Sequence, residues 1–551
     1  MKTRAAVLRE INAPWSVEEI DLDPPKAGEV LVKLVASGMC HSDEHIVTGD
    51  LAGAAPSPPM VGGHEGAGIV QEVGPGVDWL EVGDHVVFGF VPACGRCMSC
   101  VEGHSNLCDN SAAFPTGMQI GDGTSRHHTA DGLDLGLMCL LGTFAEHTVV
   151  HESSCVKIEK DWPLDKACLL GCGVVTGWGS AVYAADVQPG DYVAVVGIGG
   201  IGANAVQGAK MAGARAVAAI DPVEFKREKA LEFGATHTYS SIEEAMGKLD
   251  ESTWGRGFDK VIMTMGVGDG DALGQAFHLG GKRSKIVVTN IHPTSEQSIA
   301  VPGSFLTLFE KQLVGSLFGW GNIRKDIPRL MELYTQGQLN LDDLITRTYT
   351  LDQINEGYDA MRNGENIRGV IHLGASVVGR RREIELVVAA LAADRHILLE
   401  GPPGTGKSTL LRAVARELGV GFEFVEGNAE LTPARLIGHF DPARVLADGY
   451  DADVFVDGPL ARALRAGSLL YIEELNRVPE ETLNVLVTVM SERETHVPRL
   501  GRVAAADGFR LVAAMNPFDA VGTARISSAI YDRMCRLAVD YQTADEERSI
   551  T

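Results

Sequence analysis

Two patterns of apolar and polar positions divide the first two thirds of the chain. Residues 11–155 consist of short apolar runs separated by glycine, proline and aspartate, as at 29–35, and this punctuation is typical of an all-β unit. From 191 to about 315, apolar runs of strand length alternate with helical stretches, as where 271–277 precedes 285–289. This alternation predicts a doubly wound α/β sheet.

The clearest of these strands, 193–196, breaks into glycines before a helical stretch. The spacing G-x-G-x-x-G is met by Gly197, Gly199 and Gly202. Glycines at these positions permit a tight turn, the approach of a pyrophosphate to the backbone, and close packing of helix on strand. The next strand, 214–220, ends at Asp221, where a carboxylate can bind the adenosine ribose and would repel a 2′-phosphate. The stretch therefore predicts a Rossmann domain that prefers NAD to NADP.

A second phosphate-binding pattern lies nearer the carboxyl end of the chain. A strand at 396–400 runs into a G-x-x-x-x-G-K-S loop and the helical stretch 409–418, so we expect ATP to be held by Gly401, Gly404, Gly406, Lys407, Ser408 and Thr409. The loop amides can surround phosphates, the lysine can neutralise their oxygens, and the serine can hold Mg²⁺. A later apolar strand ends in Glu473 and Glu474, which suit Mg²⁺ coordination and the polarisation of an attacking water.

The use of basic residues separates these two parts. Positions 1–374 contain 15 Lys and 13 Arg, whereas 375–551 contain 19 Arg and the single lysine of the phosphate loop, so we place the main boundary near 374. The net charge of −25 argues against binding to nucleic acid or to anionic membranes. No stretch approaches the ~18 apolar residues of a membrane span and no signal-length apolar run opens the chain. We therefore expect a cytoplasmic protein.

Nine of the ten cysteines precede position 173, and their clustering is typical of metal ligands rather than of a disulfide framework. One cluster, with C-x₂-C-x₂-C-x₇-C spacing, comprises Cys94, Cys97, Cys100 and Cys108. Four soft ligands this close suit a closed tetrahedral zinc site with a structural role. An iron–sulfur cluster is the alternative, although the wide last gap departs from the ferredoxin pattern, and buried or redox-active thiols are another.

A second set of metal-ligand residue types is scattered through the chain. It comprises Cys40, the adjacent His64 and Glu65, and Cys172. Each of these residues alone is more often an ordinary core residue, and spacing alone does not join them.

The motifs around these residues, in this order ahead of the glycine turn, resemble those of the zinc-dependent medium-chain alcohol dehydrogenases over residues 1–373. The segments 122–126 and 366–371 also match that family. Residues 176–187 and 221–227 are similar to an actinobacterial branch that depends on a nitrosoaniline acceptor. In that branch, NAD(H) is held tightly and is re-oxidised in place by the external acceptor.

The resemblance implies a catalytic zinc with a fourth position open for water or alcohol. The matching ligands are Cys40, His64 and Cys172. Glu65 and Asp43 would orient these ligands. Zinc lowers the pKa of the substrate hydroxyl, Ser42 would accept its proton, and His45 would pass that proton to solvent.

Further matching residues would place NAD as the hydride acceptor. The nicotinamide ring would lie beside Thr176. His41 and Arg368 match contacts to the pyrophosphate, and Asp221 and Lys226 match contacts to the ribose.

Three positions bear on the substrate. Dehydrogenases of this superfamily that act on the glutathione adduct of formaldehyde place an acid and an arginine where this chain has Leu51 and Ala112. A thiol-adduct formaldehyde dehydrogenase is therefore an alternative that these residues disfavour. Phe90 falls at a pocket-wall position and favours apolar alcohols, although a buried phenylalanine is equally typical of a core.

Residues 378–545 resemble the MoxR-type AAA+ ATPases, which are usually hexameric chaperones that remodel partner proteins. The resemblance makes Glu473 a Mg²⁺ ligand, Glu474 the catalytic base and Asn516 a sensor, while Arg533 would act on a neighbouring subunit's nucleotide. The strand ends Glu-Glu where Asp-Glu is commoner. The sequence also ends soon after Arg533, so we expect an AAA+ core without its helical lid, which binds ATP and turns it over poorly.

The two resemblances together predict three domains. A zinc-binding, GroES-like, β-rich catalytic domain comprises 1–173 with 317–374, a Rossmann domain comprises 174–316, and the partial AAA+ core comprises 375–551. The active site would lie between the first two domains. We expect two zinc ions, NAD, ATP and Mg²⁺ as cofactors.

Two functions remain open from the sequence. The first is alcohol–aldehyde interconversion by a homo-oligomeric dehydrogenase, with an external electron acceptor as a possible partner. The second is an AAA+ chaperone that carries the dehydrogenase as a passenger. The dehydrogenase has every element that its family pattern requires, and this favours the first.

Overall fold

The structure is a computed structural model that describes residues 1–296, 298–373, 381–402, 405–417, 420–442, 444–445, 449–516, 527–539 and 541. Strands dominate its amino-terminal part. A mostly antiparallel sheet has the order β7 (His127–His128), β2 (Ser16–Leu22), β1 (Lys2–Leu8), β4 (Met60–Val61) and β8 (Gly136–Leu137). Its strand β1 begins ahead of the region 11–155 that the sequence pattern assigns to strands.

A second sheet brings together strands from the two ends of the amino-terminal unit. Its order is β10 (Cys155–Ile158), β6 (His85–Phe88), β5 (Glu65–Val73), β3 (Glu29–Met39), β18 (Arg368–His372) and β17 (Ile345–Thr350), while β9 (His147–His151) also pairs with β3. Strand β18 pairs antiparallel with β3, with Gly369 opposite Met39. The chain therefore returns to a sheet that it began some 330 residues earlier.

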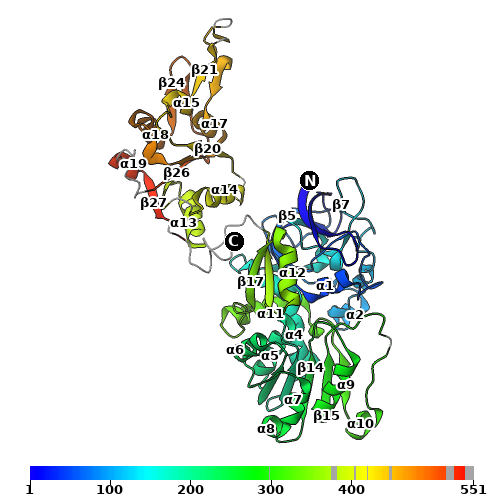
Figure 1. Cartoon of the computed structure of the whole chain (residues 1–551). Coiled ribbons are helices and arrows are strands. Elements are labelled where there is room, and N and C mark those ends of the chain that lie inside the picture. Colours follow the sequence, from blue (N-terminus) through cyan, green and yellow to red (C-terminus); the bar gives the residue numbers. More distant parts are fainter. Residues whose placement is uncertain are drawn as a thin grey trace. The chain divides into compact units, whose positions relative to one another are not determined.

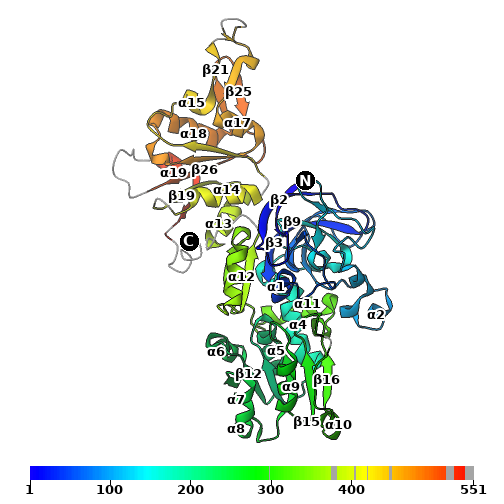
Figure 2. The same cartoon turned by 45° about the vertical axis from the view of Figure 1, so that its right-hand side comes forward.

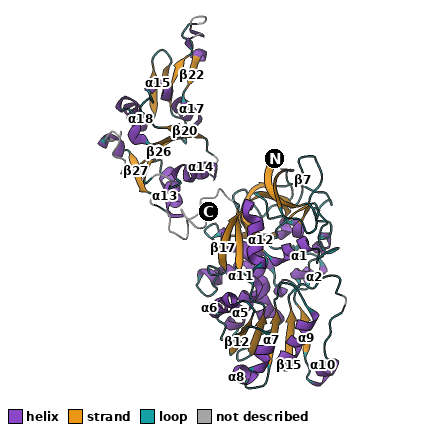
Figure 3. Ribbon diagram, in the orientation of Figure 1, coloured by secondary structure: helices purple, strands orange, loops and turns teal. Residues whose placement is uncertain are grey.

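A parallel six-stranded sheet lies between these two segments of the sequence. Its order is β13 (His237–Tyr239), β12 (Ala216–Ile220), β11 (Tyr192–Val196), β14 (Phe258–Met263), β15 (Gly280–Val288) and β16 (Gln312–Gly315). Figure 3 shows these strands in orange among purple helices. This is the doubly wound sheet that the alternation of strands and helices predicts.

Helices cover both faces of this sheet, so its central strand is buried on both sides. Val193 and Val195 of β11 face one apolar cluster with α5 (Gly200–Met211) and α6 (Glu224–Phe233). Ala194 and Val196 face another with α7 (Ile242–Gly247) and α9 (Gly270–Leu279). The continuous apolar run of β11 follows from this double burial.

The other α-helices of the unit are α1 (His41–Thr48), α2 (Met98–Val101), α3 (Leu164–Ala167), α4 (Gly173–Gly179), α8 (Leu249–Thr253), α10 (Gly303–Leu308), α11 (Ile323–Thr335) and α12 (Ile354–Arg362).

The glycine turn between β11 and α5 requires two of its glycines for different reasons. Gly197 has φ 91°, a conformation that disfavours any side chain. A Cβ atom on Gly202 would lie 2.0 Å from the carbonyl oxygen of Gly197. The first glycine thus permits the turn and the last permits the helix to pack against it, as the spacing predicts.

Within the described residues, no single helix has the length and apolar composition to cross a membrane. One pair, Leu164–Gly171 with Gly173–Ala184, meets that criterion only when its two parts are taken together across a 56° bend. Residues of both parts belong to a buried core cluster, including Leu169, Leu170 and Val174.

The carboxyl-terminal unit is built on a parallel sheet of five strands, and the chain divides into units 1–374 and 375–551. The sheet order is β20 (Phe422–Glu426), β23 (Leu469–Glu473), β26 (Arg510–Met515), β19 (His396–Glu400) and β27 (Met534–Ala538). Figure 1 labels most of the elements of both units. The strand before the phosphate loop, β19, lies inside the sheet, and the next strand, β20, lies at its far edge. The chain thus moves along the sheet in one direction after β19 and in the other after β26, so the strand order reverses between these two neighbours. Ligands of open parallel sheets bind at the carboxyl ends of strands beside such a reversal.

Helices also cover both faces of this second sheet, as Figure 2 shows. One face packs against α13 (Arg381–Ala392) and α14 (Lys407–Glu417), and the other against α17 (Pro459–Ala466) and α18 (Glu480–Glu492). The remaining elements are α15 (Pro433–Ile437), α19 (Ser528–Tyr531), and the strand pairs β21 (Gly438–Phe440) with β22 (Phe455–Asp457) and β24 (Glu494–Val497) with β25 (Gly501–Ala504).

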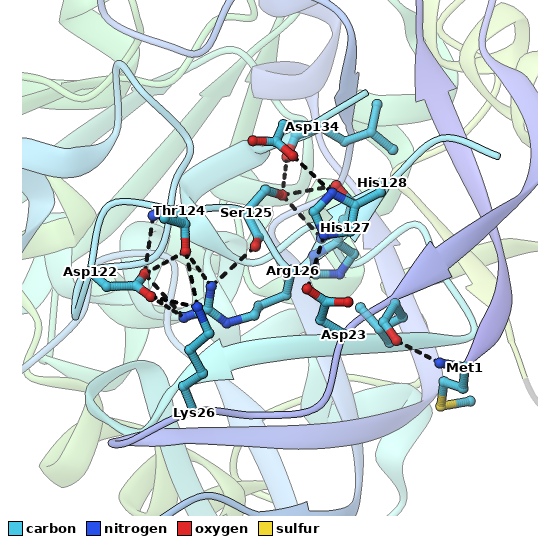
Figure 4. A network of polar contacts seen from close by, with 12 residues as sticks. Met1, Asp23, Lys26, Asp122, Thr124, Ser125, Arg126, His127, His128 and Asp134 are labelled. Carbon is cyan, nitrogen blue, oxygen red and sulfur yellow. Dashed lines mark hydrogen bonds and ion pairs between the residues drawn. The ribbon is translucent and has the colours of Figure 1, made fainter. Parts of the chain in front are cut away.

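A buried arginine holds the loop 122–126 against the start of β3. Both Arg126 and Glu29 are 1% exposed, and the guanidinium donates to both oxygens of Glu29 at 2.6 and 2.8 Å. The same guanidinium donates to Thr124 and Asp122, as Figure 4 shows. Lys26 joins the network at its exposed side through Asp122 at 2.9 Å. The buried charge pair therefore fixes a loop that the sequence marks only as a family motif.

Replacing Arg126 by methionine should lower the free energy of unfolding by about 3–5 kcal/mol, because the Glu29 carboxylate would stay buried without its partner. The half-exposed Lys26 is the matched control, and Lys26→Met should cost less than about 1 kcal/mol. Denaturant unfolding of the two variants measures both effects. Equal stabilities would contradict a structural role for the buried pair.

Candidate functional site

The scattered metal-ligand residues meet where three elements of the amino-terminal unit begin or end. Cys40 precedes α1, His64 precedes β5, and Cys172 precedes α4. Their candidate ligand atoms, with a carboxylate oxygen of Glu65, all lie within 4.8 Å of one another, and all four residues are buried. The fold therefore joins residues that spacing could not.

The donor set fits a tetrahedral zinc ion. Nε2 of His64 is buried and has no hydrogen-bond partner among the described residues, while Nδ1 lies 3.2 Å from Asp43. This leaves one ring nitrogen for a metal and uses the other to orient the ring, as in metal-binding histidines generally. A hydrogen bond from the Cys172 thiol lowers the pKa of Cys40, which favours the thiolate that zinc requires.

Behind the cluster, Glu65 and Arg368 form a buried ion pair across strand β3. Gly38 of β3 lies between them, and a Cβ atom there would meet Oε2 of Glu65 at 2.1 Å and the Arg368 guanidinium at 3.0 Å. Glu65 also accepts a 2.9 Å hydrogen bond from the Gly173 amide at the start of α4. Burial raises the pKa of the Glu65 carboxyl to about 7, against the opposing effect of Arg368. Glu65 thus connects β5, β18 and α4 beside the metal ligands.

The four cysteines of the second cluster also come together. Their Sγ atoms lie within 4.8 Å of one another, with Cys94 4.0 Å from Cys100 and Cys97 3.8 Å from Cys108. Backbone amides of Cys97 and Asp109 donate to cluster sulfurs. Burial raises the pKa of Cys94, but amides of Arg96 and Cys97 outweigh it and lower that pKa to about 7. A closed set of four sulfurs surrounded by amide donors fits structural zinc.

A cavity of about 990 Å³ connects the cluster of Cys40, His64 and Cys172 to the glycine turn. Its lining includes Cys40, His64, Cys172, Thr176, the turn from Gly197 to Ile201, Asp221, Lys226 and Arg368. A Cβ atom on Gly199 would meet no atom within 4 Å, so the backbone there is open to a ligand. The cavity is large enough for a dinucleotide with a small substrate.

Asp221 and Arg368, which the resemblance assigns to NAD, also organise the turn itself. The Asp221 carboxylate accepts hydrogen bonds from the amides of Ile198 at 2.7 Å and Val223 at 2.9 Å. A Cβ atom on Gly200 would lie 2.1 Å from Cδ of Arg368, so the arginine stem covers the start of α5. Neither contact is apparent from the sequence.

The predicted proton-transfer residues lie on helix α1, directly after the zinc-ligand candidate Cys40. Ser42 Oγ lies 3.7 Å from the Cys40 sulfur. Nδ1 of His45 lies 2.9 Å from Asp50, and Nε2 lies 2.9 Å from the Gly266 carbonyl. The ring therefore lies between a carboxylate and a backbone carbonyl. Hydrogen bonds from His45 and Thr48 lower the pKa of Asp50, a residue that the sequence reasoning did not single out.

The remaining predicted residues line the same cavity. The His41 ring packs on Gly266, where a Cβ atom would meet it at 2.9 Å, and burial lowers the pKa of His41. Thr176 is 5% exposed, and its hydroxyl has no partner among the described residues. Lys226 lies beside Gly364 at the Asp221 end of the cavity.

In the phosphate loop of the carboxyl-terminal unit, the lysine contacts the loop itself and the serine contacts the acidic end of β23. Nζ of Lys407 donates to the carbonyls of Gly401 and Pro402 and contacts Thr405 at 3.1 Å. Ser408 Oγ donates to Glu473 at 2.7 Å, and the Tyr471 hydroxyl lies 3.2 Å from that serine. The hydroxyl and carboxylate expected to hold Mg²⁺ are therefore adjacent. Gly404 lies outside the described residues.

Other residues predicted for ATP chemistry are held within their own unit. Glu474 has φ 51° and pairs with Arg477 at 2.5 Å. The guanidinium of Arg533 donates to Ser491 at 2.6 Å and to the Ala529 carbonyl. The backbone carbonyl of Asn516 accepts a 3.5 Å hydrogen bond from Asn476.

Comparison with known proteins identifies the amino-terminal unit. A 372-residue stretch is 50% identical to the NDMA-dependent alcohol dehydrogenase of Amycolatopsis methanolica, over 67% of this chain and 99% of that protein. This chain belongs to the zinc-containing alcohol dehydrogenase family. Alcohol dehydrogenase B of Mycobacterium tuberculosis is also 50% identical, over 371 residues, 67% of this chain and 98% of that protein.

Matches to domain families and to solved structures agree with this dehydrogenase assignment. Residues 26–160 match the alcohol dehydrogenase GroES-like domain, 200–336 match the zinc-binding dehydrogenase family, and 396–534 match an AAA domain of the dynein-related subfamily. The benzyl alcohol dehydrogenase of Acinetobacter calcoaceticus has a TM-score of 0.62 at 30% identity, over 68% of this chain and 99% of that one. A zinc-binding dehydrogenase of Burkholderia ambifaria has a TM-score of 0.63 at 32% identity, with the same coverage.

The dehydrogenase cavity has an apolar end beside the cluster of Cys40, His64 and Cys172. The Phe90 ring meets His64 edge-on at 5.9 Å and Phe318 at 4.7 Å between centroids. Other apolar residues that line the cavity include Leu51, Phe114, Met138 and Leu317. Leu317 and Phe318 come from the loop after β16, so sequence distance hid their part in this wall.

Three polar residues of the dehydrogenase cavity were also missed by the sequence reasoning. Thr264 donates to the Gly197 carbonyl at 2.6 Å and so holds the glycine turn. Asn290 and Asn366 line the cavity with buried carboxamides. Asn366 lies inside the matching segment 366–371, which is the one signal that pointed to it.

Proposed function

We propose that this dehydrogenase oxidises alcohols with an apolar substituent to aldehydes, in a reversible hydride transfer to NAD. The observation that carries the proposal is the single cavity that joins the metal-ligand cluster, the apolar wall and the glycine turn. A substrate in the apolar end would face the ligands on one side and Thr176 on the other. Asp221 at the far end favours NAD over NADP.

Zinc held by Cys40, His64 and Cys172 would supply a Lewis acid that acidifies the alcohol, and NAD would supply the hydride acceptor. Ser42, next to the cluster, would take the hydroxyl proton. His45 follows three residues later on α1, so the two side chains share one side of the helix. Asp50 contacts His45 and is 26% exposed, which gives the proton a path to solvent.

We further propose that NAD(H) stays bound and is re-oxidised in place by an external acceptor. The support is the 50% identity to a relative whose name states dependence on NDMA.

The cavity lining also bears on the thiol-adduct alternative. A glutathione adduct would need an acid at the position of Leu51, which lines the cavity, so this apolar residue disfavours that substrate.

The cofactor proposal is tested on the purified protein, by measuring bound NADH and alcohol oxidation with and without a nitrosoaniline acceptor. We expect about one NADH per chain and oxidation that requires the acceptor. Free exchange with added NAD and no need for an acceptor would contradict retention while leaving the dehydrogenase assignment intact.

The zinc site is tested by Cys172→Ser, which should lower bound zinc from two equivalents to one and reduce alcohol oxidation at least about 100-fold, because one thiolate ligand is lost. Cys168→Ser is the matched control, since Cys168 is buried four residues earlier and belongs to neither cluster. Metal analysis and initial rates give the result. Unchanged zinc and rate in Cys172→Ser would overturn the ligand assignment.

For the carboxyl-terminal unit we propose ATP binding with Mg²⁺ in the manner of MoxR-type ATPases. Two observations support it: the contact between Ser408 and Glu473, and the Lys407 ammonium held by carbonyls of the loop. Glu474 would act as base and Asn516 as sensor. Arg533 would first have to leave Ser491 to reach a neighbouring subunit.

Lys407→Ala should weaken ATP binding at least about tenfold, because it removes the ammonium that would neutralise phosphate oxygens. Arg435→Ala removes a 64% exposed cation elsewhere in the unit and should leave ATP binding unchanged. Equilibrium binding of a fluorescent ATP analogue measures both. Equal affinities would contradict the phosphate-loop assignment.

We propose that the dehydrogenase also forms a homo-oligomer through the edge of its six-stranded sheet. Strand β16 is the edge strand, and unpaired edges invite a second strand. Nearby apolar side chains are exposed, with Leu308 at 74% and Trp320 at 43%. A second copy would cover both.

Leu308→Glu should lower the mass observed in sedimentation, because a charge would be buried at that interface. Leu231→Glu, at a 52% exposed position on α6, is the matched control and should not change the mass. An unchanged assembly in Leu308→Glu would exclude this face.

A further inference from the structure

Two buried carboxamides in the dehydrogenase cavity have neither their donors nor their acceptors satisfied. Both the Oδ1 and Nδ2 atoms of Asn290 and of Asn366 lack a hydrogen-bond partner among the described residues, and Asn366 is 3% exposed. Leaving such a group unpaired is unfavourable, because it has lost its hydrogen bonds to water and gained none in return. Both residues line the cavity, so a molecule in the cavity can supply the missing partners.

The position of Asn366 follows from its neighbours along the chain. Two residues earlier, Gly364 packs against Val223 and Lys226, at the Asp221 end of the cavity. Two residues later, Arg368 covers Gly200 at the start of α5. Asn366 therefore lies between Lys226, which would contact the ribose, and the start of α5, where the pyrophosphate would bind.

Asn290 lies toward the opposite end. Its neighbour Thr289 contacts the Ser180 hydroxyl at 3.0 Å, and Ser180 is one helical turn beyond Thr176. Ile291, the next residue, accepts a hydrogen bond from Gly268 and so holds the loop against the sheet. The Asn290 carboxamide thus belongs to the end of the cavity where Thr176 would meet the nicotinamide.

We propose that Asn366 and Asn290 bind the two halves of the dinucleotide and slow its release, so that NAD(H) is retained between turnovers. The inference rests on the proposed function, because it requires NAD in this cavity. A carboxamide offers two N–H donors and a carbonyl acceptor. Asn366 is suited to the hydroxyls of the adenosine ribose, and Asn290 to the amide or ribose of the nicotinamide half.

The test uses Asn366→Leu and Asn290→Leu, which keep the side-chain size and remove the hydrogen-bonding groups. Nicotinamide fluorescence after mixing the NADH-loaded protein with excess NAD⁺ gives the release rate. Each substitution should raise that rate about tenfold, and the pair should raise it further. Asn363→Leu is the control, because Asn363 lines the same cavity but is exposed, and the release rate should not change.

A second measurement separates ligand binding from a structural role. Because the carboxamides have no hydrogen-bond partner among the described residues, their removal should not lower the melting temperature of the cofactor-free protein. A structural role would lower it. Asn366→Ala gives the same comparison if the leucine does not fit the space.

Two failures can be told apart. If the unsubstituted protein binds no NADH even when it is added, the proposed function fails and this inference fails with it. If that protein retains NADH and the leucine variants release it at the same rate, the carboxamides are satisfied by water only, and this inference alone is overturned.

Discussion

The buried ion pair between Glu65 and Arg368 connects the two chemical halves of the dehydrogenase. Glu65 follows the zinc-ligand candidate His64 and holds the start of α4 next to Cys172, whereas the stem of Arg368 covers the start of α5 after the glycine turn. Two charges in the same buried region are favourable only as a pair, because either one alone would keep a large desolvation penalty. The metal ligands and the glycine turn therefore depend on a contact between β5 and β18. Gly38 makes that contact possible by leaving the space between them free.

Much of the architecture could be predicted because it follows from local pattern. Strand-length apolar runs, the glycine turn and the phosphate loop each report on their own segment, and the observed sheets with the family matches confirm the β-rich, Rossmann and AAA fold classes. The cluster of Cys94 to Cys108 is equally local. Cys40, His64 and Cys172 could be joined only through family resemblance. They come together because β3, β5 and α4 pack side by side, and the sequence separation of the three residues does not indicate that packing.

What the sequence reasoning missed has a common physical cause. Asn290, Thr264 and Phe318 all line the cavity, and each follows a strand of the six-stranded sheet, so its position depends on the packing of that whole sheet. A carboxamide in a sequence is most often a surface or turn residue, so nothing marks Asn290 before its burial is known. The functional roles of Ser42, His45 and Thr176 stay predictions, since the structure gives their positions and not their chemistry.

The pairing of β18 with β3 also bears on how such a protein can be synthesised and fused. Glu65 and all the zinc-ligand candidates are translated within the first 172 residues, but Arg368 leaves the ribosome only some 200 residues later. Until then the nascent β-rich sheet lacks β18 and β17, which joins it only through β18, and its buried carboxylate lacks a cation. Strand β18 ends at His372, and the second unit begins at 375. A fused domain at this point follows the last strand of the dehydrogenase sheet, so it neither interrupts that sheet nor delays its closure.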